Sequence, residues 1–202
     1  MGQRYDVGSG KITIRIFIKN YGETNMFNIT SRAPIYDPNA VQPMRDELIA
    51  VGFEELLTPE DVEKSLNVND DKTILVMINS VCGCAAGSAR PGVSLALQNK
   101  IIPDKFYTVF AGQDKEAVDK VRSMITEYPP SSPSVALYKN GKLIYFMQRL
   151  DIEGNSHEQI AKELTDNFNE YCTAEGPSIS PENFEKVMHA KQCGSKIPLF
   201  KE

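Results

Sequence analysis

The sequence predicts an α/β fold in which helices flank a central mixed β-sheet. Two observations support this prediction. Apolar strand-like runs alternate with amphipathic helical segments from residue 43 onward, and an Asn140-Gly141 turn separates the last two strand-like runs. A helix between two strands returns the chain to the same end of the sheet, so those strands are expected to be parallel. Asn-Gly is a strong hairpin signal and adds an antiparallel pair.

The composition is that of a globular chain with an acidic balance. Its 202 residues are enough for one domain with a sizeable core. The net charge of −5, with no basic cluster, argues against a nucleic-acid surface. No apolar run approaches the length of a membrane span, so we expect no membrane partner.

The cysteine usage bears on the compartment. Four cysteines, two of them nearly adjacent, do not form the framework of a small secreted disulfide-rich protein. The N-terminus lacks the ordered basic, apolar and small-residue regions of a secretory signal. We therefore expect a cytoplasmic protein.

Residues 1–33 differ from the rest and are taken as an N-terminal extension. Lys11–Ile18 alternates like a strand between polar flanks that contain glycines. Two alternatives remain open: the segment adds an edge strand to the domain, or the native chain starts at Met26. Gly8-Ser9-Gly10-Lys11 lacks the upstream strand and the full spacing of a phosphate loop.

Residues 34–172 are expected to form the domain, which begins with two helices. Apolar residues at helical spacing predict a first helix from Pro43 that breaks at Gly52. Thr58 is suited to cap a second helix, because Pro59 follows at the first helical position and two acidic residues come next.

The centre of the domain alternates strands with helices. Thr73–Asn79 predicts a buried strand, and Cys82–Gln98 predicts a helix kinked at Pro91. Phe106–Ala111 predicts the next strand. Asp114 is expected to cap a helix that runs to about Tyr128, with its apolar residues on one face.

The hairpin and a last helix complete the domain. Strands are expected at Ser134–Lys139 and Lys142–Gln148, and Ser156 begins a capping box for a helix that ends near Cys172. This order of elements is the thioredoxin-like arrangement. Residues 173–202 form a C-terminal extension in which a short helix starts at Ser180-Pro181 and ends at Cys193-Gly194.

The turn Cys82-Gly83-Cys84, between a strand and a helix, carries the predicted chemistry. At the N-cap position, the sulfur of Cys82 can accept from the amide of Cys84 or Ala85, and the helix dipole favours its thiolate. The thiolate is the reactive form of cysteine, so Cys82 is the expected nucleophile. A buried cysteine acting as a small apolar side chain is the alternative, but Gly83 and the turn expose backbone there.

Cys84 is expected to resolve a mixed disulfide formed on Cys82, although simple burial stays open. A disulfide across one glycine closes a small ring, and strained disulfides are more easily reduced. The spacing therefore predicts a weak reductant compared with thioredoxin.

Ser132 and Pro133 are the remaining candidate site residues. A proline at the start of a strand is usually a trans residue. The thioredoxin-like arrangement instead favours a cis peptide there, facing the cysteine turn and leaving backbone free for an extended substrate.

The other cysteines and both histidines are weaker candidates. A metal site formed by Cys82, Cys84, Cys172 and Cys193 is possible in principle, but zinc and cluster sites generally use wider spacings. Without it, Cys172 and Cys193 have no expected role. His157 and His189 are expected to be solvated, since neither adjoins a motif that would make it a base.

The sequence resembles the bacilliredoxins, a thioredoxin-like family, from about Asn39 to Cys172. Asn79–Gly87 (NSVCGCAAG) is the most specific match. The other matching segments are Pro43-Met44-Arg45 with Glu47-Leu48, Gly52–Leu56, Ala89-Arg90-Pro91, Thr108–Asp114, Pro130–Ser134 and Ile152-Glu153-Gly154.

This resemblance implies reduction of mixed disulfides between protein cysteines and the small thiol bacillithiol. It implies that Cys82 attacks and takes the bacillithiol, and that Cys84 or a further thiol resolves the adduct. The expected partners are bacillithiolated proteins and the thiol co-substrate, with no tightly bound cofactor, no metal and a possible homodimer. The chain departs from the family at both extensions and at Leu150, where a polar residue or histidine is expected. A disulfide isomerase and a non-catalytic redox-sensing or metal-binding module are the alternative functions.

Overall fold

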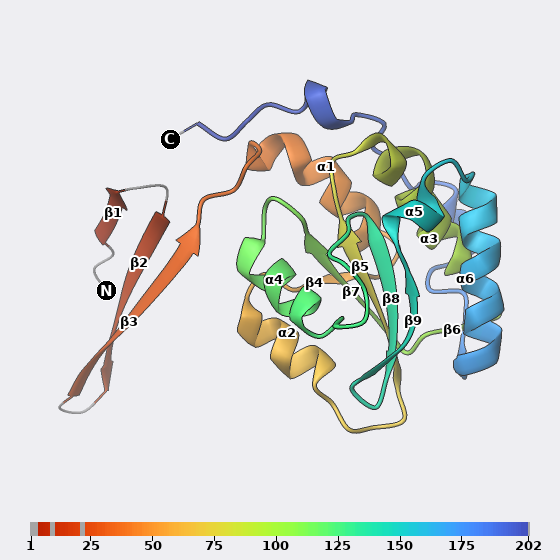
Figure 1. Cartoon of the computed structure of the whole chain (residues 1–202), viewed down its shortest axis with the longest axis horizontal. Helices are drawn as coiled ribbons and strands as arrows, with labels where there is room; N and C mark the ends of the chain where they lie inside the picture. Colours follow the sequence, from red (N-terminus) through yellow and green to blue (C-terminus); the bar gives the residue numbers. More distant parts are fainter. Residues whose placement is uncertain (1–3, 9–10, 21–22, 202) are drawn as a thin grey trace.

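The computed structural model describes residues 4–8, 11–20 and 23–201 and has a mixed sheet flanked by helices (Figure 1). The helices are α1 (Pro38–Ile49), α2 (Pro59–Leu66), α3 (Arg90–Ala96), α4 (Lys115–Ser123), α5 (Arg149–Ile152), α6 (His157–Tyr171) and α7 (Pro181–Phe184). A π-helical turn at Ala85–Ala89 precedes α3, and Gly194–Lys196 form a 3₁₀ turn. The strands are β1 (Arg4–Gly8), β2 (Lys11–Asn20), β3 (Glu23–Arg32), β4 (Glu54–Glu55), β5 (Thr73–Asn79), β6 (Ile101–Ile102), β7 (Lys105–Phe110), β8 (Ser134–Lys139), β9 (Lys142–Met147) and β10 (Ala174–Glu175).

The central sheet has the strand order β4-β7-β5-β8-β9. β4, β7 and β5 are parallel, whereas β8 pairs antiparallel with β5 and β9 pairs antiparallel with β8. Asn140 and Gly141 have φ of 53° and 68°, as a tight two-residue hairpin turn requires. The predicted thioredoxin-like α/β fold is confirmed.

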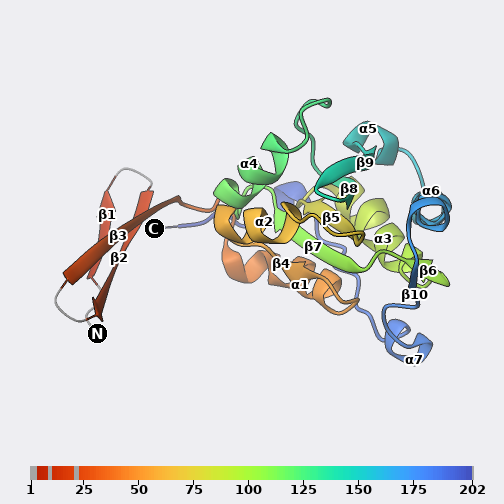
Figure 2. The same ribbon diagram turned by 90° about the horizontal axis from the view of Figure 1, so that it is seen from below.

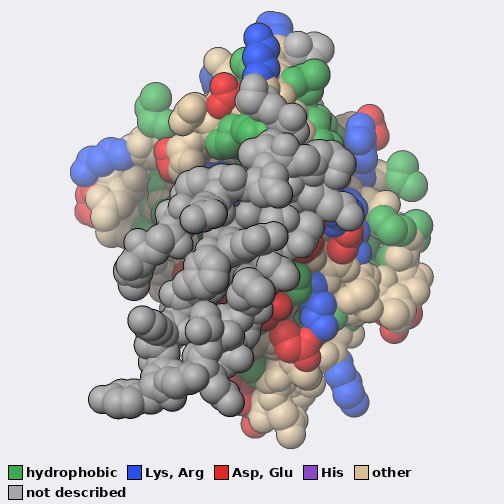
Figure 3. Space-filling model, turned by 90° about the vertical axis from the view of Figure 1, so that its left-hand side faces the viewer, with side chains coloured by type: hydrophobic (Ala, Val, Ile, Leu, Met, Phe, Trp, Pro, Cys, Tyr) green, Lys and Arg blue, Asp and Glu red, His purple; other side chains and the backbone are tan. Residues whose placement is uncertain are grey.

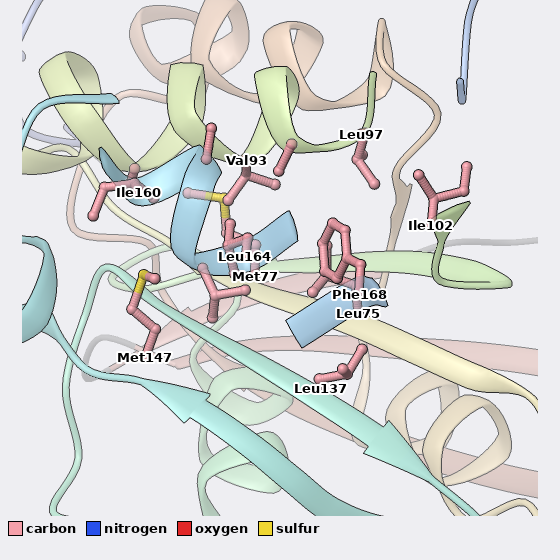
Figure 4. Packing of buried hydrophobic residues seen from close by; sticks show 14 of the residues in the cluster. Leu75, Met77, Val93, Leu97, Ile102, Leu137, Met147, Ile160, Leu164 and Phe168 are labelled. Carbon is pink, nitrogen blue, oxygen red and sulfur yellow. The ribbon is translucent and has the colours of Figure 1, made fainter. Parts of the chain in front are cut away.

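Helices cover both faces of the sheet because β5 alternates its side chains between two cores. Leu75 and Met77 point to the face covered by α1, α3 and α6, as Figure 4 shows for the residues that pack around them. Ile74, Val76 and Ile78 point to the face covered by α2 and α4. Burial on both faces explains why β5 has a continuous apolar sequence.

The first helix and the helix after the cysteines differ from the prediction. α1 begins at Pro38 rather than Pro43, because Asp37 caps it by accepting from the amide of Asn39, at 2.8 Å. Pro43 therefore lies inside the helix. Pro91 does not kink α3, because it lies in the first turn, where a proline is tolerated. The irregularity is the π-helical turn that precedes it.

The helix predicted from Asp114 to Tyr128 is shorter than expected. α4 ends at Ser123. Asp114 occupies the N-cap position but makes no side-chain capping bond to α4. Its carboxylate instead accepts from Arg45, at 2.7 and 3.1 Å, and from the amide of Phe110, at 3.0 Å.

The N-terminal strands form a sheet of their own. β1, β2 and β3 pair antiparallel in that order and lie apart from the central sheet (Figure 2). The edge-strand interpretation of this extension is therefore wrong, although Lys11–Ile18 is a strand as predicted. Ser9 and Gly10 of the phosphate-loop-like segment lie outside the described residues. Arg32, at the end of β3, forms ion pairs with Glu116 and Asp119 of α4.

The C-terminal extension crosses the domain and returns to the side from which β3 leaves (Figure 1). Ser180 caps α7 as predicted, but the helix ends at Phe184 and does not reach Cys193. Ile197 is buried beside α1. Leu199 then forms a bridge with Tyr36.

Among the described residues, no helix is both long and apolar enough to span a bilayer. On the face in Figure 3, basic and acidic side chains that are not drawn in grey are interspersed and do not gather by sign.

Candidate active site

Cys82 lies in the turn between β5 and the helix that follows it. Its sulfur accepts a hydrogen bond from the amide of Ala85, as the capping argument predicts, and one from Ser80 Oγ, each at 3.3 Å. The Sγ atoms of Cys82 and Cys84 are 2.6 Å apart, and both thiols are free. One sulfur therefore lies within reach of the other for thiol exchange.

The two cysteines have opposite pKa shifts. Burial alone raises the pKa of Cys82, but hydrogen bonds from Cys84, Ser80 and Ala85, with the charge of Arg149, outweigh it and leave a net lowering. Burial, followed by the hydrogen bond to Cys82 and repulsion from it, raises the pKa of Cys84 to about 11. The turn thus favours the thiolate at Cys82 and the protonated thiol at Cys84.

Arg149, at the start of α5, is a site residue that the sequence reasoning missed. Its positive charge contributes to the lowering of the Cys82 pKa and partly offsets the raising of the Cys84 pKa. The Arg149 side chain is nearly half exposed and is paired with Glu153 at 3.5 Å. The signal in the sequence was weak, because Arg149 lies more than sixty positions from the cysteines.

A fully buried arginine supports the turn from behind. Arg90 pairs with Glu47 at 2.7 Å, and both side chains have no exposed surface. Arg90 also donates to Ser80 O at 3.0 Å and to Asn79 Oδ1 at 3.3 Å. Since these acceptors lie two and three residues before Cys82, Arg90 holds the backbone that leads into the turn.

Ser132 and Pro133 lie at the same end of the sheet as the cysteine turn. Ser134 pairs with Ile78, so Pro133 is next to the last residue of β5. The Ser132–Pro133 peptide is cis, as the fold argument favours. Ser132 and Arg149 line one hollow of about 400 Å³, together with the exposed Leu150.

The C-terminal extension reaches the turn from the other side. The amide of Gly194 donates to Val81 O at 2.6 Å, one residue before Cys82. Cys193 and both histidines line a cavity that Gly83 also lines. His189 is not simply solvated, since its Nδ1 lies 2.7 Å from Glu47 Oε1.

The predicted alternative metal site is not assembled. Within the described part of the chain, no group of three or more His, Cys, Asp or Glu side chains could hold a metal ion. Cys172 is buried at the end of α6, where burial raises its pKa.

Comparison with known proteins places this site in a family. Residues 36–172 match the family described as "Disulphide isomerase". A bacilliredoxin of Salinibacter ruber is 46% identical over 143 residues, which cover 70% of this chain and 84% of that protein. A bacilliredoxin of Halalkalibacterium halodurans is 49% identical over 137 residues, and one of Staphylococcus aureus is 48% identical over 138 residues. Each of these matches covers 68% of this chain and 94% of the relative. The chain therefore belongs to the bacilliredoxin family, and its function is redox-related.

Proposed function

We propose that this chain is a thiol–disulfide oxidoreductase that reduces mixed disulfides between protein cysteines and bacillithiol. The observation that supports this most is the lowered pKa of Cys82 with the sulfur of Cys84 only 2.6 Å away. A nucleophile needs the thiolate, and the adduct formed on it needs a second thiol within reach.

In the first step, the Cys82 thiolate attacks the bacillithiol sulfur of the mixed disulfide. A Cys82–bacillithiol disulfide forms, the original S–S bond breaks, and the target protein leaves as a thiolate that takes a proton. Ser132 and Pro133 bind the extended backbone of the target, and Gly83 leaves the turn open.

In the second step, one of two thiols breaks the Cys82–bacillithiol disulfide: Cys84 attacks the Cys82 sulfur, or a second bacillithiol attacks the sulfur of the bound bacillithiol. Cys84, after losing its proton, forms a Cys82–Cys84 disulfide and releases bacillithiol. Alternatively, a second bacillithiol releases reduced Cys82 and leaves as bacillithiol disulfide. The first route leaves two oxidised cysteines that an external thiol must reduce, whereas the second needs only Cys82.

Substitution of each cysteine tests the roles. Cys82→Ser is expected to abolish release of bacillithiol from a modified model protein, because the attacking sulfur is lost. Cys84→Ser is expected to accumulate the adduct on Cys82, detectable by mass spectrometry of the intact protein, or to turn over only with added bacillithiol. Cys172→Ser is the matched control and should retain the parent rate. Full activity of Cys82→Ser contradicts the proposal.

Disulfide isomerisation is a second candidate, favoured by the description of the matching family. The same Cys82 thiolate would then attack non-native disulfides in unfolded proteins. Recovery of activity from a scrambled test protein separates the two functions. Efficient rescue without any activity on bacillithiol adducts favours the isomerase.

A further inference from the structure

A cavity of about 480 Å³ lies between the cysteine turn and the C-terminal extension. This volume is within the range of small-molecule sites, roughly 300–1,000 Å³. Its lining residues come from the turn and helix, from the start of α6 and from the extension: Gly83, Ala86, Gly87, Pro91, Leu95, His157, Phe184, His189, Lys191 and Cys193. Gly83 lines the cavity and directly follows Cys82 in the turn, so a group bonded to the Cys82 sulfur lies next to this cavity.

Two glycines leave this space open, although neither the packing nor the backbone conformation requires glycine at their positions. A Cβ added to Gly83 or Gly87 would meet no atom within 4 Å, and neither residue has a positive φ. Glycine in a helix is less favourable than alanine. Neither packing nor conformation therefore requires glycine at these positions, and the two glycines leave bare backbone on the wall of the cavity.

Among the described residues that line the cavity, Lys191 is cationic and none is acidic. His189 is hydrogen-bonded to Glu47, and His157 is paired with Glu158 at 3.1 Å. Lys191 forms no ion pair within the described part of the chain. Its ammonium group is thus available to a ligand, and an anionic one is favoured.

We propose that this cavity binds the small-thiol half of the mixed disulfide, and that this half is anionic. Lys191 pairs with the negative group, and the bare backbone at Gly83 and Gly87 packs against the rest of the conjugate. The inference rests on the proposed function and deepens it, because the C-terminal extension then forms part of the substrate site.

Occupancy can be measured without turnover, because Cys193 lines the cavity. In the Cys82→Ser/Cys84→Ser chain, we expect S-methylbacillithiol, which cannot exchange, to slow alkylation of Cys193 by iodoacetamide at least threefold at saturation. The neutral thioether 2-(methylthio)ethanol is the matched probe and should give no protection. Equal protection by both probes, or by neither, overturns the proposal.

Two substitutions test the same site during turnover. Lys191→Ala should raise KM for bacillithiol disulfide roughly threefold to fivefold, as expected for an exposed ion pair. It should leave turnover of the neutral bis(2-hydroxyethyl) disulfide unchanged. Lys191→Arg should restore the KM, and Lys186→Ala, an exposed lysine of the same extension outside the cavity, should not change it. Gly87→Leu should fill the cavity and raise the same KM more strongly, with an unfolding temperature close to that of the parent.

The outcomes separate this inference from the proposed function. Unchanged KM values in Lys191→Ala and Gly87→Leu, with normal turnover, overturn the proposal that the cavity binds the small thiol. They leave the proposed oxidoreductase function standing. A parent chain that is inactive on every disulfide, but whose Cys193 is still protected by the anionic probe, overturns the oxidoreductase and leaves an anionic thiol site. If Gly87→Leu does not fold, the Lys191 pair decides alone.

Discussion

At the scale of single residues, two identical side chains two positions apart have opposite pKa shifts because of the hydrogen bonds around them. Cys82 accepts hydrogen bonds from three groups, and Cys84 donates one of them. Each bond that stabilises the thiolate of Cys82 lowers the pKa of Cys82. The pKa of Cys84 is raised to about 11.

Removal of the Cys84 thiol is expected to raise the pKa of Cys82. The rate of Cys82 alkylation should rise with pH and level off above this pKa, since only the thiolate reacts. In Cys84→Ala the midpoint should move to higher pH, and the rate at pH 7 should fall roughly twofold to tenfold, because one pKa unit changes the thiolate fraction about tenfold. Peptide mass spectrometry measures the rate, with Cys172→Ala as the control. An unmoved or lower midpoint would show that the hydrogen bond is unimportant.

The sequence was sufficient for the part of the site that is local. The bond from the amide of Ala85 to Cys82 was predictable, because a capping bond depends only on a strand that enters a helix. The influence of Arg149 was not, because it depends on how the β8–β9 hairpin brings α5 to the turn. The roles of Ser132 and Gly83 stay predictions.

At the scale of elements, a buried ion pair joins α1, α3 and the end of β5. Arg90 and Glu47 have no exposed side-chain surface, and removal of one partner leaves the other charge buried without compensation. The pair thus couples the position of the cysteine turn to the packing of two helices.

Arg90→Met is therefore expected to lower the free energy of unfolding by about 3–5 kcal/mol. Arg32→Met is the matched control: Arg32 also bonds two carboxylates, but it is nearly half exposed, and its loss should cost about 1 kcal/mol or less. Urea denaturation of both variants gives the comparison. Equal losses of unfolding free energy in the two variants would mean that burial does not increase the effect of removing Arg90.

The elements were predictable where their signals were local. Thr73–Asn79 was predicted with the bounds that β5 has, because a continuous apolar run ends at polar residues. The start of α1 was not, since the interior Pro43 masked five helical residues before it. The short strands β4, β6 and β10 have two residues each. They are defined by pairing with other strands, and two residues are too few for a periodic pattern to predict a strand.

At the scale of the whole molecule, the C-terminal extension is part of the structure around the site. Ala190 bonds Arg90 and Glu47, Gly194 bonds Val81, and Ile197 is buried beside α1. No sequence signal predicted these contacts, because each joins residues about 100 or more positions apart.

Ile197→Ala is expected to loosen the extension without unfolding the domain. The lost burial weakens docking, so hydrogen exchange at the Gly194 amide should speed up by roughly tenfold or more. Leu199→Ala is the control, since Leu199 is 62% exposed. Unchanged exchange in Ile197→Ala would mean that hydrogen bonds alone hold the segment.

The buried guanidinium of Arg90 also has a consequence for the order of assembly. A guanidinium has five N–H donors, and Arg90 makes four hydrogen bonds, to acceptors from α1, from the end of β5 and the residue after it, and from the extension at Ala190. These acceptors lie far apart in sequence, so the hydrogen bonds of Arg90 are complete only when all three segments are in contact with it. A chain with one segment out of place would leave at least one buried Arg90 N–H without an acceptor, and such an unsatisfied donor is unfavourable. The backbone that leads into the cysteine turn is therefore best satisfied when α1, the end of β5 and the extension are all in place around Arg90.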